Sequence, residues 1–311
     1  MKFFNLEYLK YFNVNGFHFA TVFKKVIFGR IKVKIPMIII KIKGGLGNQM
    51  FQYAIAKAFS LETKQKFKLD ISIFDWYKLH NYGLNHFNIH PEFYTPESKW
   101  KMKLKKLFSK VVFYNEDHHQ FNYNPNLIHT KSDFLFLEGY YQSQKYFIKY
   151  ENEIRNDFQI ISPLKKQTSE MVSYMQSVHA VSIHFRRGDY IGNAVHETDK
   201  TEYYKEAMKI IESKVENPIY FLFSDDIPWV KENFTTNFET HYVDFNDAST
   251  NFEDIKLMSS CKHNIMANSS FSWWGAWLNP NPNKIVIAPK LWFNDEKVNT
   301  NDIIPENWIK L

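Results

Sequence analysis

Residues 37–59 constrain the fold of this chain more than any other stretch, and they read MIIIKIKGGLGNQMFQYAIAKAF. The apolar run at 37–43 predicts a buried strand, and the residues after it predict a glycine turn and a helix. Further strands are predicted at 66–70, 134–138, 180–185, 219–223, 264–267 and 284–288, with helical patterns such as 202–215 and 251–260 between them. This alternation favours parallel sheets, so the predicted fold class is α/β.

The length of 311 residues allows two domains of ordinary size. Ser162-Pro163, followed by a polar helical stretch at 164–177, marks the predicted junction. We therefore predict an N-terminal extension at 1–36, a first α/β domain at 37–163 and a second at 164–311.

The formal charge of +6 is concentrated in the extension, which holds seven basic residues and one acid. The other 275 residues carry 32 basic and 32 acidic groups (39 − 7 and 33 − 1), so the body of the protein lacks the basic footprint of a nucleic-acid-binding protein. Two interpretations of residues 1–36 stay open. They are a peripheral addition to a chain that starts at Met37, or a surface segment attracted to anionic lipid. The lysine-rich patch at 99–110 is interpreted as a solvated helix face.

The single cysteine, Cys261, excludes an intramolecular disulfide and a cysteine-based zinc cluster, and it favours a reducing compartment. No stretch reaches the roughly 18 apolar residues of a membrane span. The longest candidate, 16–29, lacks the apolar core and cleavage site of a secretory signal. We therefore expect a cytoplasmic protein.

The glycine turn at the start of the first predicted helix carries Gly45, Asn48 and Gln49. Glycines there let backbone N–H groups approach a ligand, and amide side chains both donate to and accept from sugar hydroxyls. Asp70 resembles the acidic residue of a dinucleotide site, but Met50 stands where the third glycine of that motif belongs. Helix capping is the alternative role of the two amides.

The segment HFRRGDY follows a buried strand. Alternation places His184 and Arg186 on the same side of that strand, and Arg186 and Arg187 arrive at its carboxyl edge, where ligands bind in open α/β sheets. A guanidinium group matches a phosphate in geometry and charge. The alternative is an internal Arg–Asp pair that holds the turn, with Asp189 orienting one guanidinium.

The next strand ends in Ser224, Asp225 and Asp226. A carboxylate there could accept from a guanine base or from ribose hydroxyls, or it could cap the following helix. No Asp-x-Asp triplet occurs in the chain, although enzymes that hold a nucleotide diphosphate through Mn²⁺ or Mg²⁺ generally need such paired oxygen ligands. Arginines can replace the metal as the charge that stabilises a departing diphosphate.

Asn268, Ser269 and Ser270 form a strong N-cap cluster before a helix with three tryptophans, which are expected to pack in the core. Hydroxyls and backbone amides at a helix N-terminus bind phosphate readily. Two arginines, an acidic strand end and a Ser-Ser helix start thus converge on a nucleotide-diphosphate pocket without a metal.

The segments GGLGNQMFQYA, HFRRGDY, FSDD and LMSSCKHNIMANSSFSWWGAWLN together resemble the bacterial α-1,2-fucosyltransferases of glycosyltransferase family 11. The resemblance runs from Met37 to about Pro289 and leaves residues 1–36 outside. It implies a GT-B architecture with two Rossmann-like domains facing a cleft. The implied reaction is metal-independent, inverting transfer of L-fucose from GDP-β-L-fucose to O2 of a terminal galactose.

The resemblance also implies roles for particular residues. Arg187 would hold the β-phosphate with Arg186 beside it, and Asp225 would lie near the guanosine. Ser269, Ser270 and Phe271 would line the diphosphate, and the other residues expected on the donor side are His184, Ser224 and Asn268. Gly45, Asn48 and Gln49 would lie across the cleft, near the transferred sugar and the acceptor.

The general base stays open among Asp189, His196 and Glu197, with Asp189 favoured. An enzyme without a distinct base is a further alternative. No cofactor or metal is expected. The expected partners are GDP-fucose and a galactose-terminated or lipid-linked glycan, with peripheral contact of residues 1–36 with the inner face of a bacterial membrane. Two alternatives remain, a GDP-fucose transferase of another linkage or acceptor and a carbohydrate-binding protein without turnover.

Overall fold

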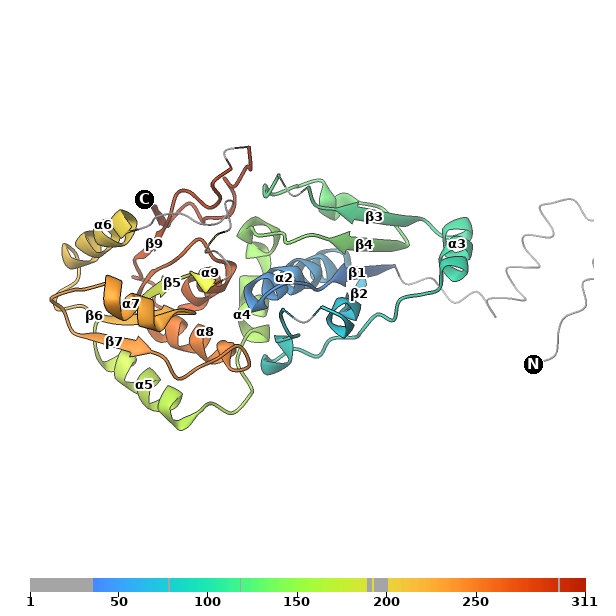
Figure 1. The fold of residues 1–311 in the computed structure, drawn as a ribbon. Helices are drawn as coiled ribbons and strands as arrows, with labels where there is room; N and C mark the ends of the chain where they lie inside the picture. The colour runs from blue at the N-terminus through green and yellow to red at the C-terminus, as the bar shows by residue number, and fades with distance from the viewer. Residues whose placement is uncertain (1–35, 78, 118, 189–191, 193–200, 296) are drawn as a thin grey trace, which may run out of the picture. The chain divides into compact units, whose positions relative to one another are not determined.

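The strand predicted at the start of residues 37–59 is β1 (Met37–Lys41), an interior strand of a four-stranded parallel sheet (Figure 1). The sheet has the order β2-β1-β4-β3, with β2 at Lys66–Asp70, β3 at Val111–Asn115 and β4 at Phe134–Glu138. Ile38, Ile39 and Ile40 are at most 2 % exposed. A strand covered on both faces needs such a continuous apolar run.

The second sheet has six parallel strands in the order β10-β9-β8-β5-β6-β7. Its strands are β5 (Ala180–Phe185), β6 (Ile219–Ser224), β7 (Thr240–Val243), β8 (His263–Ile265), β9 (Val286–Ala288) and β10 (Ile309–Lys310). The two parallel sheets confirm the predicted fold class, which is α/β of the GT-B type with two Rossmann-like sheets.

Helices connect the strands of both sheets. Those of the first half are α2 (Leu46–Thr63), α3 (Lys99–Phe108) and α4 (Glu151–Asp157). Those of the second half are α5 (Lys166–Ser177), α6 (Thr201–Glu212), α7 (Ile227–Asn233), α8 (Asn251–Ser260) and α9 (Ser270–Leu278). Short 3₁₀ helices lie at Ser72–Asp75, Leu84–His86, Leu127–His129, Gln144–Tyr146 and Ile148–Tyr150.

Helices α2 and α9 pack against each other and join the two halves. The ring of Phe51 lies 4.6 Å from that of Trp273 and 5.0 Å from that of Trp274, measured between centroids. The indole N–H of Trp274 donates to the carbonyl of Gly47 at 3.0 Å. The prediction that the tryptophans of this helix pack in the core is confirmed, since Trp273, Trp274 and Trp277 are at most 3 % exposed.

The computed structural model describes residues 36–77, 79–117, 119–188, 192, 201–295 and 297–311, and residues 37–311 form one unit. The predicted roles of Asp189, His196 and Glu197, and those of residues 1–35, lie outside the described residues. The junction at 163/164 falls between α4 and α5 and stays a prediction. No helix in the described part of the chain has the length and apolar content that a membrane span requires.

Candidate active site

The carboxyl ends of β8, β5 and β6 meet at one edge of the second sheet. Ile183 of β5 is in register with Ile265 of β8, and Phe185 of β5 is in register with Ser224 of β6. The residues that follow these strands are therefore neighbours. This register brings together the three motifs that the sequence placed at strand ends: Arg186 and Arg187, Asp225 and Asp226, and Asn268 to Phe271.

Two Arg–Asp pairs cross from β5 to β6 at this edge. Arg186 Nη1 lies 2.8 Å from Asp225 Oδ2, and Arg187 Nε lies 3.2 Å from Asp226 Oδ2. The backbone N–H of Arg187 also donates to Asp225 Oδ1 at 2.9 Å. Burial alone would raise the pKa of Asp225, but the Arg186 guanidinium and the N–H groups of Arg187 and Gly188 lower it below its usual value. The Arg–Asp alternative is thus realised, with partners from the neighbouring strand.

Arg187 is positioned by more than its ion pair. Its guanidinium lies 3.5 Å above the ring of Trp229 in α7. Asp226 accepts the N–H of Trp229 at 3.2 Å, so the capping role predicted for this acidic pair belongs to Asp226. Among the described residues nothing engages the two terminal amino groups of Arg187, whose side chain is 25 % exposed. These groups are available to an anion.

His184 lies beneath this edge and is only 4 % exposed. Burial, helped by the nearby Arg186, lowers the pKa of His184 to about 4 despite the opposing effect of Asp225. The imidazole is therefore neutral at pH 7. Its Nδ1 has no hydrogen-bond partner in the described part of the chain, and its ring lies 5.8 Å from that of Phe271. His184 is thus a buried, neutral side chain beside Phe271.

The N-terminus of α9 forms the adjoining wall. Ser269 caps the helix by accepting the N–H of Phe271, and the amide of buried Asn268 donates to the carbonyl of Trp292 at 2.8 Å. Ser270 and Phe271 are half-buried. Ser224 turns its hydroxyl toward its own loop and accepts the N–H of Asp226 at 2.9 Å. Among Asn268, Ser269, Ser270 and Phe271, the more accessible residues are therefore Ser270 and Phe271.

Helix α2 begins directly against the start of α9. A Cβ on Gly47 would lie 2.5 Å from the backbone nitrogen of Phe271 and 2.6 Å from the carbonyl oxygen of Ser270. Only a residue without a side chain permits this approach. The glycine turn of the first sheet and the Ser-Ser motif of the second, which are more than 200 residues apart, are thus in direct contact.

The three residues expected on the acceptor side have different environments. Gln49 is fully buried, donates to the carbonyls of Gly44 and Asn81, and accepts the N–H of Gly83, so it braces two loops. Asn48 is half-buried and accepts from the amide of Gln142 at 2.7 Å.

Gly45 lies under the ring of His80, which would be 3.7 Å from a Cβ at that position.

Sequence reasoning missed His80, Gln142 and Trp229. Each lies in a loop or helix start far along the chain from the motif that it supports, and no local pattern signals the contact.

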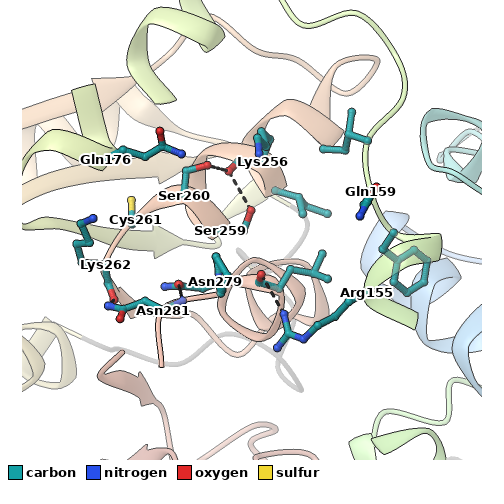
Figure 2. Close-up of a pocket in the computed structure, with 15 residues that line it drawn as sticks. Arg155, Gln159, Gln176, Lys256, Ser259, Ser260, Cys261, Lys262, Asn279 and Asn281 are labelled. Carbon is teal, nitrogen blue, oxygen red and sulfur yellow. Dashed lines mark hydrogen bonds between the residues drawn. The ribbon is translucent and has the colours of Figure 1, made fainter. Parts of the chain in front are cut away.

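A separate pocket, shown in Figure 2, contains none of the predicted site residues. Its volume is about 720 Å³, and it is lined by the last turns of α8 and α9 together with α4. Arg155 there donates to the carbonyls of Trp277 and Leu278 at 2.7 and 3.1 Å, so its charge stabilises the carboxyl end of α9.

In the part of the chain that the structure describes, no group of three or more His, Cys, Asp or Glu side chains is placed to hold a metal ion.

Residues 13–311 match the family described as Glycosyl transferase family 11. The expectation that all of residues 1–36 fall outside this resemblance is therefore wrong for residues 13–36. The "Alpha-1,2-colitosyltransferase" of Escherichia coli is 31 % identical over 89 % of this chain and 99 % of its own. The "O-antigen biosynthesis glycosyltransferase WbnK" of Escherichia coli is 30 % identical over 87 % of this chain and 99 % of its own.

More distant similarities cover less or are weaker. The human "Galactoside alpha-(1,2)-fucosyltransferase 1" is 24 % identical over 48 % of this chain and 44 % of its own. Among solved structures, fucosyltransferase NodZ from Bradyrhizobium aligns with a TM-score of 0.46 and 11 % identity, covering 77 % of this chain and 91 % of that one.

Proposed function

The chain belongs to glycosyl transferase family 11, and from this premise we propose that it is an α-1,2-fucosyltransferase that acts on a terminal galactose. The donor in this proposal is GDP-β-L-fucose, and the acceptor is a galactose-terminated glycan, such as a lipid-linked one, of bacterial O-antigen type. The relatives are an α-1,2-colitosyltransferase, an O-antigen biosynthesis glycosyltransferase and an α-1,2-fucosyltransferase, which supports the α-1,2 linkage and the O-antigen context.

One observation carries the proposal, namely the pair of terminal amino groups of Arg187 that no described residue engages. They lie at the edge of the second sheet from which α9 begins. A diphosphate bound there would therefore contact a fixed guanidinium and the positive end of a helix dipole. When O2 of galactose attacks C1 of fucose, the bond from C1 to the β-phosphate oxygen breaks and GDP leaves with its charge. Arg187 and Arg186 would stabilise that charge without a metal.

The proton of the acceptor hydroxyl must pass to a base or to solvent. We propose Asp189 for this role, with His196, Glu197 or transfer to solvent without a distinct base as the alternatives. Because the transfer proceeds in one displacement, the product would be the α-anomer. We further propose that the enzyme needs no cofactor and works in the cytoplasm, with residues 1–36 in peripheral contact with the membrane.

A second donor is favoured by a specific observation, the 31 % identity to an α-1,2-colitosyltransferase over nearly the whole of both chains. Colitose is L-fucose without its 3-hydroxyl group, so only a contact to that hydroxyl separates the two donors. A site that hydrogen-bonds a substrate hydroxyl rejects the analogue that lacks it far more strongly than an apolar pocket rejects an added hydroxyl.

The test is an assay of the full chain with GDP-fucose and GDP-colitose against lactose, N-acetyllactosamine and Galβ1-3 acceptors. NMR of the product should show an α-1,2 linkage, and EDTA should leave the rate unchanged. A product linked elsewhere would leave only a GDP-sugar transferase of other specificity. Binding of sugar without any dependence on GDP, unaltered by Arg187→Ala, would indicate a carbohydrate-binding protein, and loss of activity in EDTA with rescue by Mn²⁺ would overturn the metal-free mechanism.

A further inference from the structure

Helix α3 is the most strongly basic element of the described chain. The segment 98–115 holds six lysines and no acidic residue. Five of these lysines lie within α3 itself, whose sequence is KWKMKLKKLF, and no residue of this helix is fully buried. The rest of the fold therefore does not explain the composition of α3.

The orientation of α3 is the reverse of an ordinary surface helix. Helical spacing places Trp100, Leu104 and Leu107 on one face. This face points away from the sheet, because the side chains of Trp100 and Leu107 are 60 % and 72 % exposed. Among the described residues, Trp100 and Leu107 belong to neither hydrophobic cluster, so their side chains are open to a partner outside the described chain.

The inward side of α3 carries Met102, which lines a small pocket with Phe113, and two lysines that reach rings of the sheet. The ammonium group of Lys105 lies 4.3 Å from the ring centroid of Phe134, and that of Lys106 lies 4.6 Å from the centroid of Phe113. These cation–π contacts hold the helix with its apolar stripe outward. The sequence-based interpretation of this patch as a solvated helix face does not account for the two exposed apolar side chains.

The outward stripe is flanked by lysines without acidic partners. Lys105 pairs with Glu97, but Lys99, Lys101 and Lys103 form no ion pair with any residue that the structure describes. Uncompensated charge beside an exposed tryptophan and leucine combines the two attractions of an interfacial helix, which are electrostatic and apolar.

The chain just after α3 and the start of β1 share a partner, Asp133. The backbone N–H of Lys110 donates to the side chain of Asp133 at 2.8 Å, and the N–H of Met37 donates to the carbonyl of Asp133 at 3.0 Å. Residues 1–36 carry a net charge of +6 and nine Phe and Tyr residues. The residues that follow α3 and the first residue of β1 thus lie at the same end of the first sheet, through their bonds to Asp133.

We propose that α3 docks on the surface of an anionic lipid bilayer. Trp100 and Leu107 insert at the level of the headgroups, and Lys99, Lys101 and Lys103 contact the lipid phosphates. A second copy of α3 or the segment 1–36 would carry the same sign of charge and be repelled. Nucleic acid would satisfy the lysines but leave the apolar stripe in water.

The experiment uses the full chain and sedimentation with vesicles of phosphatidylcholine alone or with one quarter phosphatidylglycerol. We expect binding only to the anionic vesicles. The double variant Trp100→Ser/Leu107→Ser and the triple variant Lys99→Ser/Lys101→Ser/Lys103→Ser should each weaken it at least ten-fold. Their turnover of a soluble acceptor and their thermal unfolding should match those of the parent.

Matched controls are Lys209→Ser/Lys214→Ser, which removes two exposed lysines of the other half, and Ile161→Ser, which removes another exposed apolar side chain. Both should bind vesicles like the parent. Full-strength binding by the α3 variants would overturn the proposal. The proposal would also be overturned if the α3 variants bound normally and only a Lys24→Ser/Lys25→Ser/Arg30→Ser variant lost binding. Docking would then depend on residues 1–36. Duplex DNA binding that falls in the lysine variant but not in Trp100→Ser/Leu107→Ser, without vesicle binding, would assign the surface to nucleic acid instead.

Discussion

At the scale of single residues, Arg187 is the best positioned charge of the candidate site. Its Nε is engaged by Asp226 and its plane is stacked on Trp229, while its terminal amino groups are left for a ligand. A donor that is already fixed in the free protein needs little reorganisation energy when charge develops on a leaving group. A flexible lysine at this position would keep the charge but lose the stacked, planar fork.

We therefore expect Arg187→Ala to lower kcat by about 100-fold, as loss of one charge-stabilising donor does. Arg187→Lys should recover only part of that loss. Steady-state kinetics with varied donor concentration would measure both. The matched control is Arg155→Lys, because Arg155 also lies over a tryptophan, at 4.4 Å from Trp277, but lines the separate pocket of Figure 2. Equal kcat for the parent and Arg187→Ala would remove Arg187 from the mechanism.

His184 gives a second residue-scale prediction, on stability. Its pKa is lowered to about 4 in the fold, against a value near 6.5 in the unfolded chain. The unfolded chain therefore binds more protons between these values, and stability falls as pH decreases from about 6.5 to 4. Between pH 6.5 and pH 4, the free energy of unfolding of the parent should fall by up to about 3 kcal/mol more than that of His184→Gln.

Urea unfolding of both proteins at several pH values would measure this difference. The variant is needed because Asp254, whose pKa is raised to about 7 mainly by burial, makes the fold more stable as the pH falls, which opposes the effect of His184. Asp254 contributes equally to the parent and to His184→Gln, so its effect cancels in the comparison. Parallel stability profiles for the parent and His184→Gln would contradict the assignment.

The residue types of the site were predictable from sequence, but their partners were not. Two arginines at the end of a buried strand predict an anion site or an ion pair at a sheet edge. The ion pair is observed at Nε of Arg187, and the anion site stays a prediction for its terminal amino groups. The acids that pair with the arginines are Asp225 and Asp226, which follow in sequence by almost 40 residues. Only the register of β5 against β6 decides that pairing, and a sequence pattern does not fix it.

At the scale of elements, the contact between the first turns of α2 and α9 determines how the two sheets meet. The backbone of Gly47 touches that of Ser270 and Phe271, so neither side can yield by rotating a side chain. The amides Asn48 and Gln49 directly follow this glycine, and the residues expected to hold the diphosphate directly follow Ser269. A shift at this contact would move both groups.

Gly47→Ala should therefore destabilise the protein by on the order of 1–3 kcal/mol through overpacking, although Ala is by itself the better helix former by about 1 kcal/mol. It should also raise KM for the donor or the acceptor. Thermal unfolding and kinetics would test this, with Gly83→Ala as the control. A Cβ on Gly83 meets only the flexible end of Leu46, at 3.1 Å. A stabilised Gly47→Ala variant with normal kinetics would contradict the tight contact.

Interior strands were easier to predict from sequence than edge strands. β2, β4 and β5 have the predicted bounds, and β1, β6, β8 and β9 differ by a few residues at their ends. The three strands that sequence reasoning missed, β3, β7 and β10, all lie at sheet edges. Of these, β7 and β10 are only four and two residues long, so they carry too few residues for a clear pattern. Edge position alone does not explain the miss of β3, because β3 (VVFYN) is apolar and the edge strand β2 (KFKLD) was predicted. The helix of the lysine patch was predictable, but its outward apolar face was not.

At the scale of the whole molecule, the buried side chains of both halves form one continuous cluster. It includes Phe51 and Phe147 from the first half and Trp273 and Trp274 from the second, with the rings of Phe147 and Trp274 stacked at 5.4 Å. A second cluster is confined to one face of the second sheet and includes Ile211 and Leu222. The boundary at 163/164 stays a prediction, and residues on both sides of it contribute to this shared cluster.

A shared core predicts that residues 37–311 unfold in one cooperative transition. Tryptophan fluorescence and far-UV circular dichroism should give the same urea midpoint. Phe51→Ala, which opens the shared cluster, should lower the free energy of unfolding by about 3–5 kcal/mol and shift both signals together. Ile211→Ala, which alters only the second cluster, should shift the same single transition by about 2–5 kcal/mol. Two resolved transitions, one moved by Phe51→Ala and the other by Ile211→Ala, would instead show that the two halves unfold independently and that 163/164 is a true domain boundary.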